Sequence, residues 1–163
     1  MNDLIITCAV SGAEVTKKDN PAVPYTVAET AREAGAAYAA GASIIHLHVR
    51  EDDGTPTQSR KRFKACIDAI RDVCPDVIIQ PSTGGAVGMT DMERLQSTEV
   101  AEPRVNLTHP EMATLDCGSC NFGGEEIFIN SDTTIETFGR TMIERGIKPE
   151  LEVFDKGMID IAL

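Results

Sequence analysis

The sequence predicts an α/β fold, namely a (β/α)₈ TIM barrel of which this chain supplies about the first five strands. Short apolar runs, typical of strands buried on both faces, alternate with amphipathic segments, and this alternation indicates parallel βα units. The runs begin near residues 4, 43, 77, 112 and 150, so the repeat is nearly even. The chain stops inside the apolar segment 158–163, with no capping residue. We therefore expect one barrel domain over residues 1–163, truncated at its C-terminus.

A second architecture fits the same alternation. A five-stranded doubly wound sheet is complete at this length, whereas an eight-stranded barrel needs about 250 residues. A doubly wound sheet would make this chain, with its 163 residues, a non-catalytic α/β binding module. The uncapped apolar end favours the barrel, and both readings stay open on the pattern alone.

The first predicted unit is a strand at residues 4–10 followed by a helix. Thr26 and Glu29 have the spacing of a capping box, in which each side chain bonds the backbone N–H of the other. The helix is expected to continue to about Ala40, where Gly41 provides a C-terminal stop.

The next two units follow the same plan. A strand at 43–49 leads into a charged turn at 50–54, and a helix at about 59–73 has apolar residues at the i, i+3, i+4, i+7 positions. The other predicted elements are a strand at 77–80, a short helix near 90–96, a strand at 112–115, a helix from Ser131 or Asp132 to about Gly146, a strand at 150–154 and a helix beginning at Gly157.

Composition excludes several classes of partner. The formal net charge is −11, and such a surface repels nucleic acid and anionic lipid. Aromatic content is 4% with no Trp, which argues against stacking on bases. The N-terminus has neither a basic region nor a long apolar stretch, so no signal peptide or membrane span is expected. An odd number of cysteines, five, indicates reduced thiols and a cytoplasmic location.

The strongest functional signal is a pair of histidines in the second predicted strand. Side chains alternate along a strand, so His46 and His48 point the same way, at the end where α/β folds place their sites. Two imidazoles so spaced can chelate one metal ion, and zinc suits them; two hydrogen-bonded histidines lining a pocket are the alternative. A catalytic zinc takes three protein ligands, and His109, the only other histidine, precedes a strand at the opposite end.

Further polar groups follow other predicted strands. The loop at 82–85 offers hydroxyls and close backbone N–H groups that can hold a carboxylate or phosphate, although a simple glycine turn fits too. Glu152 lies within a strand, where a carboxylate is costly unless paired, so a functional role is favoured. The remaining candidates on this rim are Glu14 after the first strand and Thr114 and Asp116 on one face of the fourth.

These segments together resemble the β-keto acid cleavage enzymes, and the resemblance covers nearly the whole chain. The stretches that carry it are Val-Ser-Gly-Ala-Glu at 10–14, Gly-Ala-Ser-Ile-Ile-His-Leu-His-Val-Arg at 41–50, Gln-Pro-Ser-Thr-Gly-Gly at 80–85, and residues 110–115, 121–123 and 149–153.

The resemblance implies a (β/α)₈ barrel that binds zinc and cleaves β-keto acids. A β-keto acid such as 3-keto-5-aminohexanoate, a compound of lysine fermentation, reacts with acetyl-CoA to give acetoacetate and a new acyl-CoA. By position, His46 and His48 are metal ligands and Glu152 belongs to the catalytic network. Glu14 faces the far end of the substrate, where a carboxylate suits an amino group. The other implied substrate contacts are Ser82, Gly85, Thr114 and Asp116.

Two features depart from the family pattern. The family commonly has Asn where this chain has Asp116, so that contact does not transfer directly. The family has eight strands, and the part beyond this chain carries the third metal ligand, an arginine and the acid–base aspartate. We therefore expect this chain alone to be inactive. Alternatively it is a half-barrel that pairs with another half, because open sheet edges expose apolar surface; in either case a homo-oligomer is expected.

Overall fold

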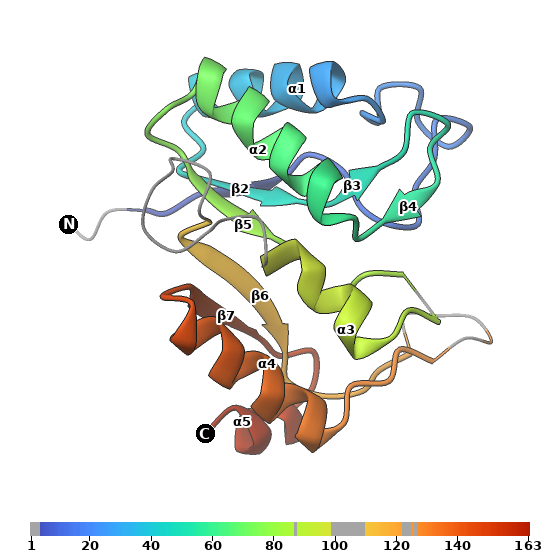
Figure 1. Cartoon of the computed structure of the whole chain (residues 1–163), viewed down its shortest axis with the longest axis vertical. Coiled ribbons are helices and arrows are strands. Elements are labelled where there is room, and N and C mark those ends of the chain that lie inside the picture. Colours follow the sequence, from blue (N-terminus) through green and yellow to red (C-terminus); the bar gives the residue numbers. More distant parts are fainter. Residues whose placement is uncertain (1–3, 87, 99–109, 122–124, 126) are drawn as a thin grey trace.

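The computed structural model describes residues 4–86, 88–98, 110–121, 125 and 127–163. Within them parallel strands alternate with helices, as Figure 1 shows, and the predicted α/β fold is confirmed. The elements, in chain order, are β1 (Thr7–Ala9), α1 (Val27–Ala39), β2 (Ile44–Leu47), β3 (Val49–Arg50), β4 (Pro56–Thr57), α2 (Arg60–Val73), β5 (Ile78–Pro81), α3 (Asp91–Arg94), the 3₁₀ helix η1 (Leu95–Thr98), β6 (Met112–Asp116), α4 (Asp132–Glu144), β7 (Lys148–Glu152) and α5 (Gly157–Ala162).

The parallel strands lie side by side in the order in which they occur in the chain. Strands β1, β2 and β5 form one hydrogen-bonded sheet in that order, and β6 and β7 form a second. The two sheets meet where β5 contacts β6. A doubly wound sheet of the dinucleotide-binding type would place the fourth strand beside the first. The sequential order instead agrees with the expectation from βα units wound in one direction.

Side chains join the two sheets where no backbone ladder does. At the start of the strands, the Glu111 Oε2 atom accepts a hydrogen bond of 3.0 Å from the Ile79 N–H, and Arg71 pairs with the same carboxylate. At the far end, the Thr83 N–H donates to the Thr114 Oγ1 at 3.1 Å, and the Thr83 hydroxyl donates to the Thr114 carbonyl at 2.7 Å. These bonds fix the place of β6 relative to β5 at both ends.

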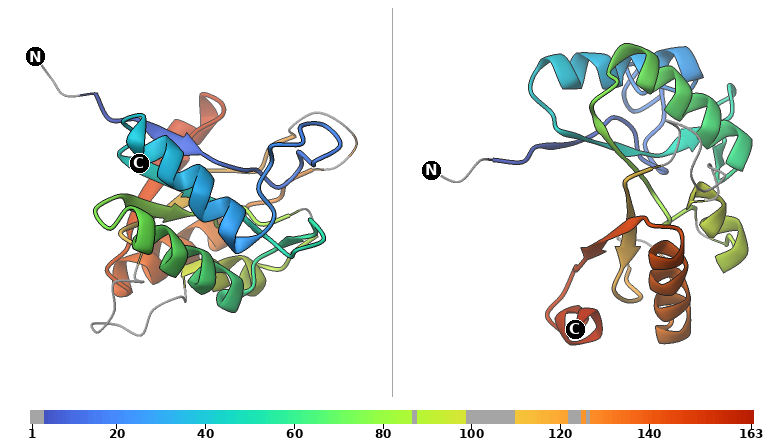
Figure 2. Two further views of the ribbon diagram at one scale, coloured as in Figure 1. Left: turned by 90° about the horizontal axis from the view of Figure 1, so that it is seen from above. Right: turned by 60° about the vertical axis from the view of Figure 1, so that its left-hand side comes forward.

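Two apolar clusters support the strands. Helices α1 and α2 lie next to each other over β2 and β5 in the upper part of Figure 1, and their cluster includes Phe63 and Ile67, both 0% exposed. The second cluster packs α4 against β6 and β7 around Phe138 and Met142. The segment before β1 extends from the body of the molecule, as both views of Figure 2 show, and Leu4 is 83% exposed.

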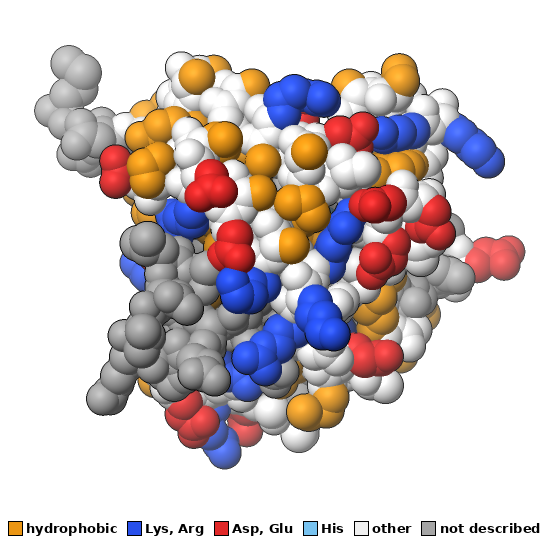
Figure 3. All heavy atoms as spheres, turned by 45° about the horizontal axis from the view of Figure 1, so that its top comes forward, with side chains coloured by type: hydrophobic (Ala, Val, Ile, Leu, Met, Phe, Trp, Pro, Cys, Tyr) orange, Lys and Arg blue, Asp and Glu red, His pale blue; other side chains and the backbone are white. Residues whose placement is uncertain are grey.

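Local sequence signals fix the helix starts. The Thr26 hydroxyl accepts from the Glu29 N–H at 3.2 Å and Glu29 accepts from the Thr26 N–H at 3.0 Å, so the predicted capping box is confirmed. Ser131 caps α4 in the same way, by accepting from the Thr134 N–H. On the face shown in Figure 3, acidic and basic side chains lie next to one another. In the described part of the chain, no helix has the length and hydropathy needed to cross a bilayer.

Three predicted strands differ from the observed ones. The first is limited to Thr7–Ala9, because the residues before it extend into solvent. The predicted strand at 43–49 is wrong at its end, because Val49 and Arg50 leave the parallel sheet and pair antiparallel with Pro56–Thr57. The last strand is shifted to Lys148–Glu152, since it follows the register of β6 from Met112 to Asp116, and Phe154 lies beyond it.

Candidate active site

A cavity of about 350 Å³ lies at the carboxyl ends of the parallel strands. It collects polar groups from every βα unit in the described part of the chain, as the sequential strand order requires. Seven of the predicted site residues, together with their neighbours, converge there from positions far apart in the sequence. The lining residues are Glu14, His46, His48, Ser82, Gly84, Gly85, Asp116, Phe128, Glu152 and Phe154.

The two histidines form an adjacent pair on one wall. Their ring centroids are 4.9 Å apart with an interplanar angle of 68°. The His46 Nδ1 atom lies 3.0 Å from the Oε1 atom of Gln80, which is fully buried and opposite His46 in the β2–β5 register. An amide oxygen only accepts, so Nδ1 carries the proton and Nε2 keeps its lone pair.

His48 is held as a neutral imidazole. Burial, followed by the neighbouring His46 and Arg50, lowers the pKa of His48 to about 3. His48 therefore presents a lone pair, and the hydrogen bond to Gln80 favours the His46 tautomer whose Nε2 atom has one; a lone pair is what a metal ion needs. Among the residues that the structure describes, no group of three His, Cys, Asp or Glu side chains could hold a metal. His109, the other histidine considered, lies outside the described residues.

A pair of carboxylates forms another wall. Asp116 and Glu152 stand opposite each other in the β6–β7 register, each at the end of its strand. Burial, a hydrogen bond with Asp116, and the negative charges of Asp116 and Glu150 raise the pKa of Glu152 to about 8. The Glu152 carboxyl can therefore hold a proton near neutral pH, which is the property of a general acid–base group.

The loop after β5 brings Ser82, Gly84 and Gly85 to the cavity. The Ser82 Oγ atom accepts from the Gly84 N–H at 3.1 Å, which closes a tight turn. Gly85 has a φ of +70°, and a Cβ there would lie 3.0 Å from the Arg94 side chain, so only glycine fits. Thr114, predicted to contact substrate, is 1% exposed and does not line the cavity; its hydroxyl supports this loop through Thr83.

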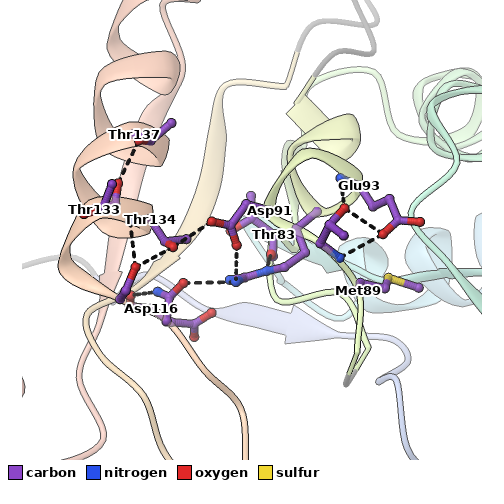
Figure 4. Close-up of polar contacts among 12 residues, drawn as sticks. Thr83, Met89, Asp91, Glu93, Asp116, Thr133, Thr134 and Thr137 are labelled. Carbon is purple, nitrogen blue, oxygen red and sulfur yellow. Dashed lines mark hydrogen bonds and ion pairs between the residues drawn. The ribbon is translucent and has the colours of Figure 1, made fainter.

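An arginine from α3 ties this loop to the carboxylate wall. Arg94 is 3% exposed, and it donates to the Thr83 carbonyl at 2.8 Å and to the Asn130 Oδ1 atom at 3.0 Å. Asn130 in turn donates to the Asp116 carbonyl. The Thr134 hydroxyl donates to the Asp91 carboxylate at 2.7 Å, and Figure 4 shows these two side chains pointing toward each other near Thr83 and Asp116. The Arg94 guanidinium also lies between two aromatic rings, those of Phe128 and Phe138.

Several residues at the site were not predicted from the sequence. Gln80 could have been predicted, because it is a polar residue at the end of the apolar run at 77–80. Arg94 and Asn130 could not have been predicted from the sequence, because their roles depend on how α3 and the segment before α4 fold against the cavity. Phe128 and Phe154 give the cavity an apolar side that the sequence did not indicate.

The chain is similar in sequence to proteins of known function. The model of the family described as beta-keto acid cleavage enzyme matches residues 3–163. The "3-keto-5-aminohexanoate cleavage enzyme" of Fusobacterium nucleatum subsp. nucleatum is 72% identical over 163 residues, which are 100% of this chain and 57% of that protein. The enzyme of the same name from Acetoanaerobium sticklandii is 65% identical over the same shares.

More distant relatives extend the comparison. The "3-oxoadipate:acetyl-CoA acetyltransferase" of Cupriavidus necator is 39% identical over 95% of this chain and 51% of that protein. Among solved structures, a ternary complex of ObcA with C4-CoA adduct and oxalate superimposes with a TM-score of 0.74 at 20% identity. That match covers 87% of this chain and 33% of ObcA, and it shows a shared fold. The chain thus spans little more than half the length of the curated relatives it matches.

Proposed function

The chain belongs to the β-keto acid cleavage enzyme family, and from this premise we propose that it forms the zinc-binding part of an enzyme of that activity. The reaction condenses a β-keto acid with acetyl-CoA and yields acetoacetate and a new acyl-CoA. The substrate we propose is 3-keto-5-aminohexanoate, after the names of the relatives that are 72% and 65% identical. The fold we propose for the whole enzyme is the (β/α)₈ barrel.

One observation carries the proposal. The cavity brings the adjacent histidine pair, with His48 held neutral by burial, within the same 350 Å³ space as a protonatable glutamate, at the ends of parallel strands. Sites of α/β barrels lie at this end of the strands, because the loops there can vary without disturbing the core. An α/β binding module would not need two imidazoles in the lone-pair state beside a carboxyl of raised pKa.

The donor set fits zinc as two of its three protein ligands. His46 offers Nε2 because Gln80 accepts from Nδ1, and His48 is neutral. The third ligand comes from outside the described residues, because within them no carboxylate or thiol is grouped with the pair. When bound, zinc supplies a Lewis acid that polarises the keto group of the substrate and favours loss of a proton from C2.

The protein's own residues bind and orient the substrate around that centre. Glu152 can hold a proton beside the reacting carbon atoms of the substrate, since its pKa is raised to about 8. The turn at 82–85 presents the Ser82 hydroxyl and the Gly85 N–H to the substrate carboxylate, and the Thr114 hydroxyl supports the turn by accepting from the Thr83 N–H. Asp116 lies beside Glu152 and keeps its proton in place.

Glu14 sets the substrate class in this proposal. It lies in the loop after β1 and reaches the same cavity, and no described residue forms a hydrogen bond or ion pair with its carboxylate. An unpaired carboxylate at the rim suits a substrate with a cationic group, such as the amino group of 3-keto-5-aminohexanoate. Phe128 and Phe154 cover the intervening carbon chain.

A half-barrel that pairs with a second copy is the other candidate, and one observation favours it. Apolar side chains at the end of β7 are open to solvent: Leu151 is 50% exposed and Phe154 is 51% exposed. Such a surface needs covering by protein. This candidate predicts a dimer whose dissociation exposes the apolar surface, which sedimentation against protein concentration would reveal.

The test of the proposed function is product formation. The enzyme, loaded with zinc, is incubated with ¹³C-acetyl-CoA and 3-keto-5-aminohexanoate, and the products are followed by mass spectrometry. We expect acetoacetate and a new CoA thioester in equal amounts, and neither with the variant His46→Ala. Absence of acetoacetate from the unaltered enzyme, or full zinc content and activity in His46→Ala, would refute the proposal.

A further inference from the structure

Arg50 is a buried arginine that holds two loops together beside the cavity. It is 2% exposed and lies in β3, two residues after His48. Its Nη1 atom donates to the Gly54 carbonyl at 2.8 Å, and its Nη2 atom donates to the carbonyls of Gly12 and Val15 at 2.6 and 2.8 Å. One guanidinium therefore satisfies three backbone acceptors, a geometry that its planar fork permits and a lysine ammonium does not reproduce.

Two of those acceptors flank Glu14. The carbonyls of Gly12 and Val15 lie on either side of it, so Arg50 fixes the backbone from which the Glu14 carboxylate reaches the cavity. The same loop is also anchored at its start, where the Ser11 hydroxyl donates to the His48 carbonyl at 3.2 Å. Figure 1 shows the loop after β1 running beside the β3–β4 hairpin. The strand that carries the histidines thus also carries the support for Glu14.

A second set of contacts fixes Arg50 itself. The Tyr25 ring lies 5.4 Å from the guanidinium carbon, and the Tyr25 hydroxyl accepts from the Lys17 N–H at 2.7 Å, further along the same loop. Arg62 donates to the Arg50 carbonyl at 2.6 Å and to the Tyr25 carbonyl at 3.1 Å. Gly54, with φ of +94°, leaves room for the tyrosine, because a Cβ there would lie 2.3 Å from its ring. Because these contacts hold Arg50 from several sides, its guanidinium keeps a fixed position between the two loops.

We propose that Arg50 is a positioning residue for substrate selection: it acts through Glu14 to set the span between that carboxylate and the histidine pair. A β-keto acid that binds at the histidines and has a cationic group at its other end is then preferred over a β-keto acid of the same length that lacks the cationic group. This inference rests on the role given to Glu14 in the proposed function. Arg50 itself touches neither substrate nor metal.

The test compares two substrates of the same chain length, only one of which has the cationic amino group. The ratio of kcat/KM for 3-keto-5-aminohexanoate to that for 3-oxohexanoate is measured in the enzyme as isolated, in Arg50→Lys, in Glu14→Gln and in the double variant. We expect Glu14→Gln to lower the ratio about tenfold, the loss expected for one charge-assisted hydrogen bond. Arg50→Lys should lower it about three- to tenfold in the native background, and have no further effect on it when Glu14 is already Gln.

Two more variants serve as a control and as a substitute for Arg50→Lys. Arg32→Lys changes an arginine whose side chain is 66% exposed and should leave the ratio unchanged. Should Arg50→Lys fail to fold, Tyr25→Phe removes the bond to the Lys17 N–H while keeping the ring, and should lower the ratio in the same direction by about twofold.

Each of the other outcomes refutes one specific claim. An unchanged ratio in Glu14→Gln removes the role of Glu14 and with it this inference. A lowered ratio in Glu14→Gln but not in Arg50→Lys or Tyr25→Phe refutes the positioning role and leaves the proposed function standing. An equal effect of Arg50→Lys with and without Glu14 makes Arg50 a general structural residue.

Discussion

Two regions of the molecule line one cavity, and their strands β2 and β7 differ in how completely they are enclosed. The histidine half comprises β1, β2, β5 and helices α1 and α2; the carboxylate half comprises β6, β7 and α4. In the histidine half, β2 has a strand on each side and Ile45 and Leu47 are 0% exposed. In the carboxylate half, β7 pairs within the described residues only with β6, and Leu151 is 50% exposed.

The difference indicates where each kind of chemistry can be placed. Metal ligands need fixed distances, and the histidines, which we propose as zinc ligands, lie in the enclosed half, with Gln80 bonded to one ring. A proton-holding carboxyl needs a shifted pKa more than a fixed distance, and Glu152 obtains it from burial and the neighbouring Asp116. The open side of the carboxylate half is the place where further protein must cover apolar surface.

The largest expected effect is on stability, and it tests the enclosure directly. Ile67→Ala in the histidine half removes side-chain atoms from a fully packed cluster and should cost about 3–4 kcal/mol of unfolding free energy. The matched change Ile135→Ala, at a residue that is 8% exposed in the carboxylate half, should cost about 2 kcal/mol because that site can collapse more readily. Urea unfolding of both variants gives the values, and equal costs would remove the difference between the halves.

The next effect concerns the fixed histidine. Gln80→Met keeps the size of the side chain but removes the acceptor for His46 Nδ1, so zinc affinity should fall about 10–100-fold. Gln58→Met is the matched control, because Gln58 is also a buried glutamine but bonds the Ser82 and Arg94 carbonyls instead. Competition with a chromogenic chelator measures both. Equal affinities in Gln80→Met and the unaltered protein would show that Gln80 does not orient His46.

The two halves should respond to pH in opposite directions. Glu152 has a folded pKa of about 8 against an ordinary 4.5, so between these values the folded state binds more protons and stability falls as pH rises. His48 has a folded pKa of about 3 against 6.5, so in metal-free protein stability falls as pH drops through that range.

Glu152→Gln tests the alkaline side. The variant cannot lose a proton, so its unfolding free energy should decline by about 1–2 kcal/mol less than that of the unaltered protein between pH 5 and pH 8. Unfolding by urea at three pH values across this range measures the slope. Parallel slopes in the two proteins would mean that Glu152 titrates as it does in the unfolded chain.

The smallest effect is expected at the open edge. Leu151→Thr replaces a half-exposed side chain on β7 by another β-compatible residue and should change stability by less than about 0.5 kcal/mol. Thermal unfolding checks this. A loss above about 2 kcal/mol would mean that this face is already covered, for instance by a second copy, and sedimentation of the variant would then show whether a dimer is lost.

Sequence signals predicted those features that depend on neighbours in the chain. The capping box of Thr26 and Glu29 and the apolar face of α2 are local, and both were found as predicted. The shared direction of His46 and His48 follows from strand alternation alone. Strand alternation also puts Thr114 and Asp116 on one face. It does not predict how deeply each side chain is buried, and Thr114 is buried beneath the loop after β5.

Features that depend on register or on packing between distant segments were not predicted. The β3–β4 hairpin forms in a charged stretch that reads as a turn, because pairing with Pro56–Thr57 decides it. The bond between Gln80 and His46 requires knowing which residues of β2 and β5 stand opposite. Arg94 reaches the site only because α3 folds back over the loop after β5.

Zinc binding to the histidine half tests the central claim most directly. Metal content is measured by mass spectrometry on protein purified without added metal, for the unaltered protein, for His46→Ala with His48→Ala, and for Glu152→Gln. For the whole enzyme, which also supplies the third ligand, the account predicts close to one zinc per chain in the unaltered protein and in Glu152→Gln, and none in the double histidine variant. Zinc retained without the two histidines, or lost with Glu152 alone, would contradict the division of the site between an enclosed metal wall and an open carboxylate wall.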